Sequence, residues 1–220
     1  MKHVVITGAN RGIGLALARH YHGEKWSVTG VCRESSSELK KVATRIIKGI
    51  DITQEDSVKK LKDRLEGQNI DLLINNAGLL QDETLGSINF DSLRLQMEIN
   101  AFAPLRVSES LLPNLHEGSK IANITSRMGS IADNDSGGRY GYRASKAALN
   151  ALGRSLAIDL KERGIAVAQL HPGYVKTRMV NFGGLITPEE SVLGLTERIA
   201  NLNLENSGSF WHSNGEELPW

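Results

Sequence analysis

Tyr142 and Lys146 stand four residues apart in the segment Y-R-A-S-K. On a helix, positions i and i+4 share one face, so this spacing predicts that the phenol and the amine lie together. A free phenol has a pKa of about 10, which is too high for efficient proton exchange near neutral pH. An ammonium at about 4 Å would stabilise the phenolate by about 4 kcal/mol at an effective dielectric constant of 20. The pair is therefore a candidate proton donor with an electrostatic partner.

Ser126 follows an apolar run that reads as a strand, and its hydroxyl could hydrogen-bond a substrate oxygen as charge develops on it. A lone Tyr-x-x-x-Lys is more often a solvated helix face than a catalytic pair. Tyr140 is a second phenol nearby, but its spacing of six residues from Lys146 puts it on another helix face. We therefore take Tyr142 as the proton donor.

The segment T-G-A-N-R-G-I-G at Thr7–Gly14 follows a strand pattern and opens a helical one. Glycines allow a tight turn and close approach of phosphates, and the N–H groups of a helix start favour anions. The spacing G-x-x-x-G-x-G differs from the common dinucleotide fingerprint, so a strand–helix turn that binds nothing is the alternative. A phosphate cradle and a tuned phenol together predict hydride transfer from a dinucleotide.

The end of the second expected strand bears on the choice between NAD and NADP. The chain reads Val31-Cys32-Arg33 there, and Arg11 lies inside the glycine segment. Two guanidinium groups suit a 2′-phosphate, so we expect NADPH rather than NADH. The alternative is that both arginines are ordinary solvated side chains.

Further cofactor contacts are expected at the ends of the third and fourth strands. Asp51-Ile52 could place a carboxylate at the adenine amino group, or could simply lead into the next helix. Asn75–Gly78 (N-N-A-G) could brace neighbouring strands, and its small residues would permit close contact.

Short apolar or β-branched runs alternate with helical patterns along the 220 residues. This alternation predicts an α/β fold: one doubly wound Rossmann domain spanning residues 1–220, with a seven-stranded, mostly parallel sheet flanked by helices. The expected strands are Lys2–Thr7, Trp26–Cys32, Thr44–Ile50, Ile70–Asn75, Lys120–Thr125, Ile165–His171 and Ser209–His212.

Local signals mark some helix ends and loops. We expect one helix to start at Thr53 and another at Thr187, and the helix after Tyr142 to stop at Gly164. The loops 133–139 and 181–186 are candidate walls of the active site.

The bulk composition excludes several partners. With 26 basic and 25 acidic residues there is no charge excess for nucleic acid, and no apolar run is long enough for a membrane helix. One cysteine and no secretory signal favour a cytoplasmic protein. The six histidines lack ligand spacing, so we expect no metal.

The chain resembles the short-chain dehydrogenase/reductase family over nearly its whole length. The motifs are T-G-x-x-x-G-I-G, N-N-A-G, Asn100 in E-I-N-A, S-x-x-G from Ser126, Y-x-x-x-K, and P-G-x-V-x-T from Pro172. Within the family it is most similar to sniffer and C-factor-like carbonyl reductases.

The resemblance implies residue roles. Tyr142 would be the general acid, Lys146 would lower its pKa and hold the nicotinamide ribose, Ser126 would orient the carbonyl, and Asn100 would hold a relay water. The implied cofactor-binding residues are Gly8, Asn10, Arg11, Gly12, Ile13, Gly14, Cys32, Arg33, Asp51, Ile52, Asn76, Ala77, Gly78, Tyr142, Lys146, Pro172, Gly173, Val175 and Thr177.

We therefore expect an NADPH-dependent reductase of aldehydes, ketones or quinones. A dinucleotide-binding signalling or sensor protein with little turnover is the alternative, and NAD-linked alcohol oxidation is a weaker third. We expect a homo-oligomer, a dimer or a tetramer, formed through the segments Asn89–Leu115 and Tyr142–Arg163. The substrate pocket is expected to be apolar, with Met128, Tyr174, Met179 and Phe182 as lining.

Overall fold

The computed structural model describes every residue from Met1 to Trp220. Seven strands form one sheet in the order β3-β2-β1-β4-β5-β6-β7, and all neighbouring strands run parallel. The predicted doubly wound α/β fold is thereby confirmed. Because both ends of the chain contribute strands to this sheet, we infer that residues 1–220 form a single domain. The strands are β1 (His3–Thr7), β2 (Ser27–Cys32), β3 (Arg45–Lys48), β4 (Ile70–Asn75), β5 (Leu115–Ile124), β6 (Ala166–His171) and β7 (Phe210–His212).

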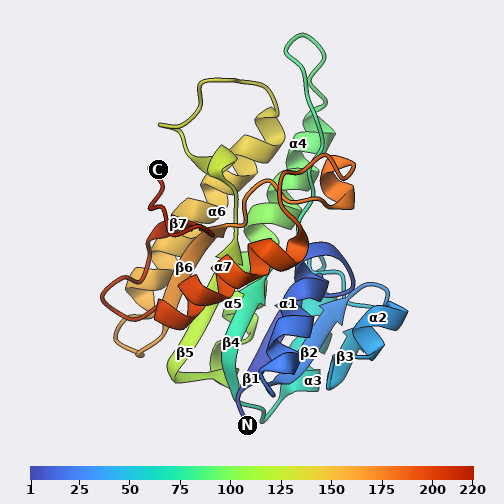
Figure 1. Ribbon diagram of the computed structural model, residues 1–220, viewed down its shortest axis with the longest axis vertical. Helices are drawn as coiled ribbons and strands as arrows, with labels where there is room; N and C mark the ends of the chain where they lie inside the picture. The colour runs from blue at the N-terminus through green and yellow to red at the C-terminus, as the bar shows by residue number, and fades with distance from the viewer.

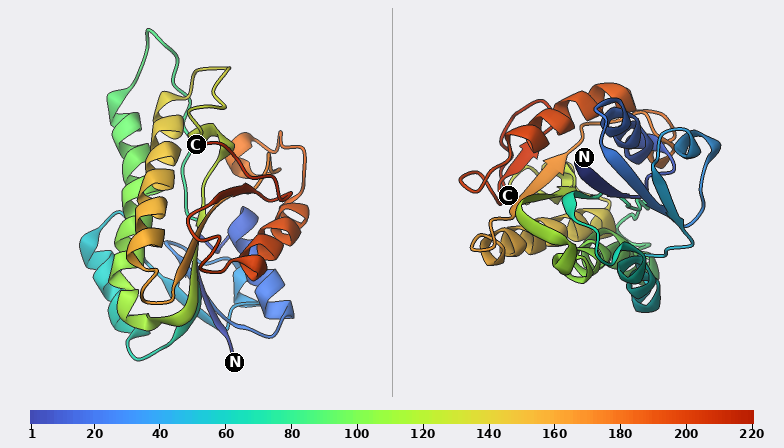
Figure 2. Two further views of the ribbon diagram at one scale, coloured as in Figure 1. Left: turned by 90° about the vertical axis from the view of Figure 1, so that its left-hand side faces the viewer. Right: turned by 90° about the horizontal axis from the view of Figure 1, so that it is seen from below.

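Helices cover both faces of the sheet, as the alternation of strand and helix patterns predicts (Figures 1 and 2). In the right-hand view of Figure 2, α1 and α7 lie on one face, and α3, α5 and α6 lie on the other. The helices are α1 (Gly12–Gly23), α2 (Ser37–Lys40), α3 (Glu55–Leu65), α4 (Phe90–Met97), α5 (Ala103–Ser110), α6 (Tyr140–Asp159) and α7 (Pro188–Asn201). Short helical turns are the π-helical η1 (Glu98–Phe102) and the 3₁₀ turns η2 (Leu112–Asn114), η3 (Arg127–Gly129) and η4 (Arg178–Val180).

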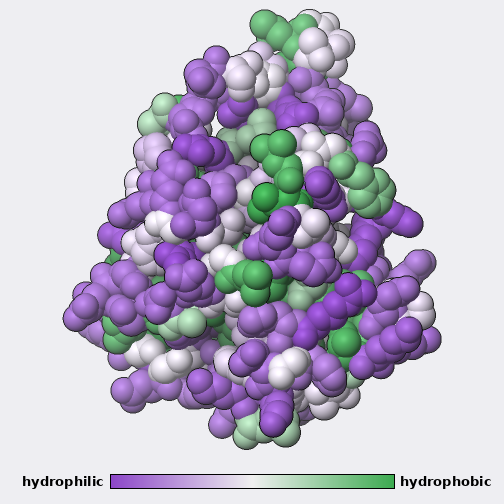
Figure 3. Space-filling view, viewed as in Figure 1, coloured by the Kyte–Doolittle hydropathy of each residue, from purple (hydrophilic) through white to green (hydrophobic).

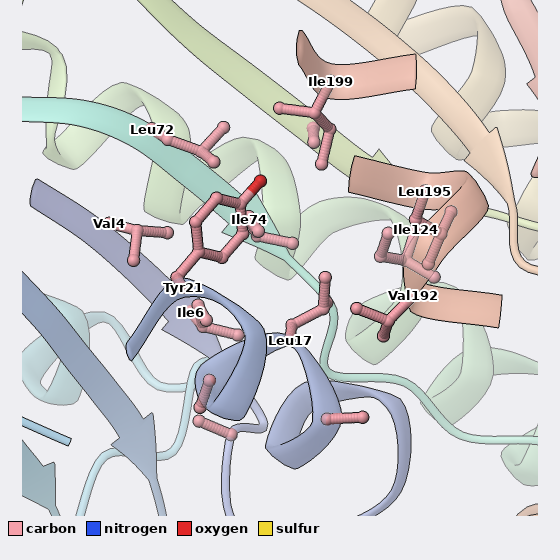
Figure 4. Close-up of a cluster of buried hydrophobic side chains, with 14 of the residues drawn as sticks. Val4, Ile6, Leu17, Tyr21, Leu72, Ile74, Ile124, Val192, Leu195 and Ile199 are labelled. Atoms are coloured by element: carbon pink, nitrogen blue, oxygen red, sulfur yellow. The ribbon is translucent and has the colours of Figure 1, made fainter. Parts of the chain in front are cut away.

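Each face of the sheet has its own hydrophobic core. The cluster under α1 and α7 contains 22 buried residues, and the cluster under α3, α5 and α6 contains 19. Figure 4 shows the first cluster, where Leu17 and Tyr21 of α1 and Leu195 of α7 meet side chains of the central strands. Side chains covered on both faces explain why the strands read as unbroken apolar runs.

Strand β1 lies between β2 on one side and β4 on the other, and the chain winds outward from it in opposite directions. Such a change of winding direction leaves a crevice at the carboxyl ends of the strands, where ligands of doubly wound folds bind. The loops that precede α4 and α6 rise above this edge at the top of Figure 1. The face in Figure 3 is mostly polar, with small scattered apolar patches.

The start of α7 has the cap that the sequence predicts. The Thr187 hydroxyl accepts a hydrogen bond from the Glu190 backbone N–H, and the Glu190 side chain accepts one from the Thr187 N–H. Pro188 occupies the first helical position. This is a complete capping box, which satisfies two N–H groups that a helix start otherwise leaves unpaired.

Two other predicted helix ends are wrong. Helix α3 starts at Glu55 rather than at Thr53, because the Thr53 hydroxyl donates to Asp51 instead of capping the helix. Helix α6 ends at Asp159, five residues before Gly164, and the chain continues through a turn to that glycine. Gly164 has a φ of +69°, so it closes the turn ahead of β6.

Candidate functional site

The loop between β1 and α1 can be built only from glycine at its key positions. Gly8 and Gly12 have φ angles of +67° and +54°, in the left-handed region. Gly14 has an ordinary φ, but a Cβ there would collide with the carbonyl oxygen of Gly8. The loop therefore leaves the amino end of α1 uncovered by side chains, as an anion-binding turn requires.

The N-N-A-G segment after β4 lies against this glycine loop. The Asn76 side-chain amide donates to the carbonyl oxygens of Thr7 and Gly8, at 3.0 and 3.2 Å. The Thr7 hydroxyl accepts from the backbone N–H groups of Asn76 and Ala77. The predicted bracing of neighbouring strands is thus visible. The two segments form one wall of the crevice.

The carboxyl end of β2 presents a positive charge near the third strand. Arg33 and Arg11 are both exposed, and neither takes part in an ion pair or a side-chain hydrogen bond. Burial raises the pKa of Asp51, but hydrogen bonds from Thr53 and the charge of Arg33 outweigh it and leave that pKa lowered. Cys32 is buried, and burial raises the pKa of its thiol.

Tyr142 lies in the first turn of α6 and is only 8% exposed, whereas Tyr140 is 37% exposed. Burial raises the pKa of the Tyr142 phenol, while a hydrogen bond from Ser126 and the charge of Arg139 lower it. The net direction is upward. In the chain itself desolvation outweighs the favourable contacts, and the lowering of the phenol pKa by Lys146 stays a prediction for the protein with cofactor bound.

Lys146 is fully enclosed and follows Tyr142 by one helical turn. Its Nζ lies 5.8 Å from the centre of the Tyr142 ring and donates to the carbonyl oxygen of Ile124 at 2.8 Å. Burial lowers the pKa of Lys146 to about 7. The amine is thus poised between its two protonation states near neutral pH, instead of being a permanent cation.

Asn100 occupies the π-helical turn η1 between α4 and α5. Its side chain bonds Leu79 twice, accepting from the backbone N–H at 2.8 Å and donating to the carbonyl at 2.7 Å, and it also donates to Ser145. A Cβ on Gly78 would lie 3.3 Å from Asn100 Oδ1 and 3.8 Å from Lys146 Nζ. The structure therefore brings these three motifs together, and π turns are frequent at functional sites.

The loop after β6 completes the crevice opposite the glycine loop. The Pro172 carbonyl accepts a hydrogen bond from Ser191 at 2.6 Å, which ties the loop to α7. A Cβ on Gly12 would lie 3.5 Å from the Thr177 side chain, so the two loops face one another closely. Val175 is bridged to Ile186.

Of the remaining predicted contacts, Ile13 lines the pocket described next, and Asn10 lies half-buried in the turn ahead of α1. Ile52 is 9% exposed and belongs to the hydrophobic core under α3 and α5. Its side chain serves packing there.

A cavity of about 450 Å³ opens above Ser126 and Tyr142. The apolar lining expected from the sequence is only partly correct, because Phe182 is 64% exposed and lies outside the cavity. The loop 181–186 contributes nothing to the lining, which ends at Val180, whereas the loop 133–139 does line the cavity. Charged side chains make up much of the wall. Asp133, Asp135 and Arg139 come from the predicted loop 133–139, whereas Arg127 and Arg143 were not predicted.

Trp220 fixes residues 130–132, which lead directly into the cavity-lining loop 133–139. The Trp220 carbonyl oxygen accepts hydrogen bonds from the backbone of Ile131 and Ala132, at 2.8 and 2.9 Å, and from the Ser130 hydroxyl at 3.0 Å. The Trp220 ring stacks on Phe210 of β7 with centroids 5.5 Å apart. Trp220 thus connects the edge strand β7 to the segment beside the cavity. No local sequence pattern predicts this contact between distant segments.

His171 also lines the cavity. Its ring meets His212 edge to face at 4.7 Å, and its Nδ1 is buried without a hydrogen-bond partner. Burial, together with the neighbouring charges of His212 and Arg127, lowers the pKa of His171 to about 3. The imidazole is therefore neutral at physiological pH and contributes a polar edge without charge.

The geometry of the crevice fits a dinucleotide. Its floor is the side-chain-free turn of Gly8, Gly12 and Gly14, and the cavity with Tyr142 and Ser126 continues from it past Ile13 and Thr177. No helix combines the length and apolarity needed to cross a bilayer. No cluster of three or more His, Cys, Asp or Glu side chains is arranged to hold a metal ion.

The chain is similar to several known proteins. The relatives include 1-hydroxy-2-glutathionyl-2-methyl-3-butene dehydrogenase of Rhodococcus sp. (strain AD45), 39% identical over the full length of both chains. C-signal of Myxococcus xanthus is 43% identical over 154 residues, which are 69% of this chain and 93% of that protein.

Two solved structures superpose over the whole chain. NADPH-bound carbonyl reductase from chicken fatty liver matches with a TM-score of 0.89 and 32% identity, covering 100% of this chain and 99% of that one. Carbonyl reductase Sniffer of D. melanogaster matches with a TM-score of 0.91 and 30% identity, covering both chains completely. The likeness to sniffer-type reductases inferred from the motifs is confirmed.

The family described as short chain dehydrogenase matches residues 2–183, which include the glycine loop, the Asn100 turn and the Ser126, Tyr142 and Lys146 set. The chain is an oxidoreductase that belongs to the short-chain dehydrogenase/reductase family.

Proposed function

We propose that this protein reduces a carbonyl group, in an aldehyde, ketone or quinone, with NADPH as the hydride source. One observation carries the proposal. The phenol of Tyr142 and the amine of Lys146 are both buried at the end of the glycine-lined crevice, and Ser126 lines the same cavity as Tyr142. Such a convergence of proton donor, amine and hydroxyl beside a phosphate cradle suits carbonyl reduction.

The bound dinucleotide would supply the hydride that reduces the carbonyl carbon. Tyr142 would donate its proton to the carbonyl oxygen, and Ser126 would hydrogen-bond the same oxygen as negative charge develops. Lys146, when protonated, would stabilise the phenolate left behind. It would also hold the nicotinamide ribose. Asn100 would fix the Leu79 backbone and, through a water, link Lys146 to solvent.

The remaining contacts would hold the cofactor along the crevice. Backbone N–H groups around Gly12 would receive the phosphates, the Asp51 carboxylate would face the adenine, and Thr177 would contact the carboxamide. The other binding residues would be those implied by the family motifs.

Arg11 and Arg33 support NADPH over NADH, because both are exposed and neither forms an ion pair. A 2′-phosphate would be their counter-ion. A solved relative binds NADPH. The double substitution Arg11→Ser, Arg33→Ser should lower kcat/KM for NADPH by about 100-fold while changing that for NADH little, since two charge-assisted contacts of about 1.5 kcal/mol each are lost. Equal kcat/KM values for the two cofactors in the wild-type protein would contradict the assignment.

The enzymatic proposal is tested by NADPH oxidation with a panel of aldehydes, ketones and quinones. Tyr142→Phe removes only one hydroxyl, so it should fold normally and lose at least about 100-fold in kcat, the scale of general acid catalysis. Tyr140→Phe, two residues earlier and more exposed, is the matched control and should keep wild-type kcat. Equal rates for wild type and Tyr142→Phe would remove the reductase function.

A second candidate is a dinucleotide-binding signalling protein with little turnover. The similarity to C-signal over 69% of this chain favours keeping it in the test. Such a protein would bind NADPH with unchanged Kd in Tyr142→Phe and would oxidise none of it with any carbonyl. A third candidate is oxidation of an alcohol, as the name of the Rhodococcus dehydrogenase suggests. Assaying both directions with both cofactors separates it.

We also propose self-association through α4, α5 and α6. These helices expose large apolar side chains, including Phe90 at 63% and Ile158 at 60%. Sedimentation equilibrium would measure the number of subunits, and a monomer at micromolar concentration would contradict this proposal.

A further inference from the structure

Two of the three arginines in the cavity wall are neutralised by acidic side chains. Arg127 forms ion pairs with Asp133 and Glu216. Arg139 forms an ion pair with Asp82. The two arginines and three carboxylates of these pairs sum to a charge of −1, so neither arginine is left as a free cation.

Arg143 differs from both, because it takes part in none of the ion pairs of the molecule. Its Nε donates to the carbonyl oxygens of Gly137 and Gly138, each at 3.2 Å, and its Nη2 donates to the Ser136 hydroxyl at 2.8 Å. Neutral acceptors of this kind orient a guanidinium without cancelling its charge. Nη1 makes no hydrogen bond, so a fixed and half-buried cation retains a donor for a ligand.

The position of this cation works against the stability of its own helix. The amino end of a helix carries partial positive charge, and basic side chains there are unfavourable. Helix α6 nevertheless has Arg139 as its N-cap, at a left-handed φ of 50°, and Arg143 in its first turn, with no acidic residue in that turn. The Glu83 carboxylate accepts a hydrogen bond from the Gly141 N–H at this helix start but pairs with neither arginine. It offsets part of this unfavourable charge, while Arg143 itself stays without a paired anion.

From this arrangement we propose that the cavity selects carbonyl substrates that carry a carboxylate, and that Arg143 binds this carboxylate. The inference rests on the proposed reductase function. Asp135 is the opposing charge, since it lines the cavity without a cationic partner and is exposed. Asp135 weakens the attraction of Arg143 for an anion, but Arg143 is the more buried of the two groups, so its charge is less screened by solvent.

The test compares 4-carboxybenzaldehyde with its methyl ester, which differ in charge and share the reacting aldehyde. The measured quantity is the ratio of their kcat/KM values, so effects common to both substrates cancel. We expect wild type to prefer the carboxylate by about tenfold or more, the strength of one charge-assisted contact. Arg143→Gln should bring the ratio close to one, and Arg143→Lys should keep part of the preference.

Two further variants separate a charge effect from a loop effect. Asp135→Asn should raise the ratio, because it removes the competing negative charge. Arg154→Gln is the matched control, since Arg154 lies on the same helix and donates to the Ser207 carbonyl away from the cavity. It should leave the ratio at the wild-type value. A wild-type ratio of one, or a ratio that Arg143→Gln does not change, would overturn the inference.

A binding measurement keeps this inference separate from turnover. In the Tyr142→Phe protein with NADPH present, calorimetry should show 4-carboxybenzaldehyde binding about tenfold more tightly than in the double variant that adds Arg143→Gln. Equal Kd values would refute the carboxylate site. If both aldehydes bind with the expected difference but neither is reduced by wild type, the reductase proposal fails and the anion site stands.

Discussion

Glu83 accepts a hydrogen bond at 3.1 Å from the backbone N–H of Gly141, the residue directly before Tyr142. The carboxylate is 6% exposed and also accepts from the side chains of Gln96 and Ser92 on α4. A Cβ on Gly141 would come within 2.6 Å of the Gln96 amide nitrogen and 2.9 Å of Glu83 Oε1. A buried acid from a distant loop therefore sets where the catalytic helix begins.

Replacing Glu83 should consequently damage both stability and activity. Glu83→Ala leaves two buried donors, the Gly141 N–H and the Gln96 amide, without this acceptor, and we expect a loss of about 2–4 kcal/mol in the free energy of unfolding. kcat should fall about tenfold or more even where the protein stays folded, because a shift of the helix start displaces the phenol. Glu83→Gln should recover part of both. Chemical denaturation and steady-state kinetics measure the two effects.

Asp91→Asn provides the control for that experiment, since Asp91 forms an exposed ion pair with Arg94 on the same helix as Gln96. It should change the free energy of unfolding by less than about 0.5 kcal/mol. If Glu83→Ala behaved like this control, the carboxylate would have no positioning role.

The buried amine of Lys146 predicts a pH profile. Its pKa is lowered to about 7 by burial, so the fraction of protein with an ammonium beside Tyr142 falls as pH rises through neutrality. If reduction needs that ammonium, kcat/KM for NADPH should decline above a pH of about 7, because this parameter reports groups of the free enzyme. A profile that is flat from pH 6 to 9 would show that the lysine does not control the reaction.

The same shift makes a prediction about stability. The unfolded chain binds the lysine proton with an ordinary pKa of 10.5 and the folded chain with about 7. Between these values the unfolded state holds more protons, so this group makes the protein less stable at pH 7 than at pH 10. Lys146→Met removes the penalty and should raise the free energy of unfolding by about 1–3 kcal/mol at pH 7, less than the full shift implies because the bond to Ile124 is lost.

Activity should be lost in the same variant, so a gain in stability and a loss of function would appear together. Denaturation at pH 7 and at pH 9.5 provides the measurement, with the gain shrinking at the higher pH. A Lys146→Met protein that is less stable than wild type at both pH values would contradict the lowered pKa.

The sequence was a good guide to elements whose signals are local. Alternating apolar runs and helical patterns located all seven strands, and Thr187-Pro188 located the start of α7. The spacing of Tyr142 and Lys146 was enough to predict that they share one face of a helix, because helix geometry alone decides this. The Thr53 and Gly164 signals failed because a hydroxyl has more than one acceptor within reach and because a glycine can close a turn as well as a helix.

Tertiary contacts account for what the sequence could not provide. The phenol pKa depends on burial that no local pattern encodes, and neither the π turn at Asn100 nor the bonds of its side chain to Leu79 have a signal in the sequence. The position of Arg143 in the cavity wall was not predicted, because within Y-R-A-S-K it looks like an ordinary basic residue of a helix. The one usable signal was the misfit of two arginines at a helix start.

A substitution at Gly153 would measure how tightly α6 packs against the sheet. Three buried amides form a row across β4, β5 and β6, in which Asn75 donates to Asn123 and Asn123 donates to Gln169, each at 2.9 Å. A Cβ on Gly153 would collide with the Gln169 Oε1 atom. Gly153→Ala should therefore destabilise the protein by about 1–3 kcal/mol through overpacking, although alanine favours helix. Gly23→Ala, in the last turn of α1 with open space around it, should instead stabilise by about 0.5–1 kcal/mol, and thermal denaturation of the two variants should show shifts of opposite sign.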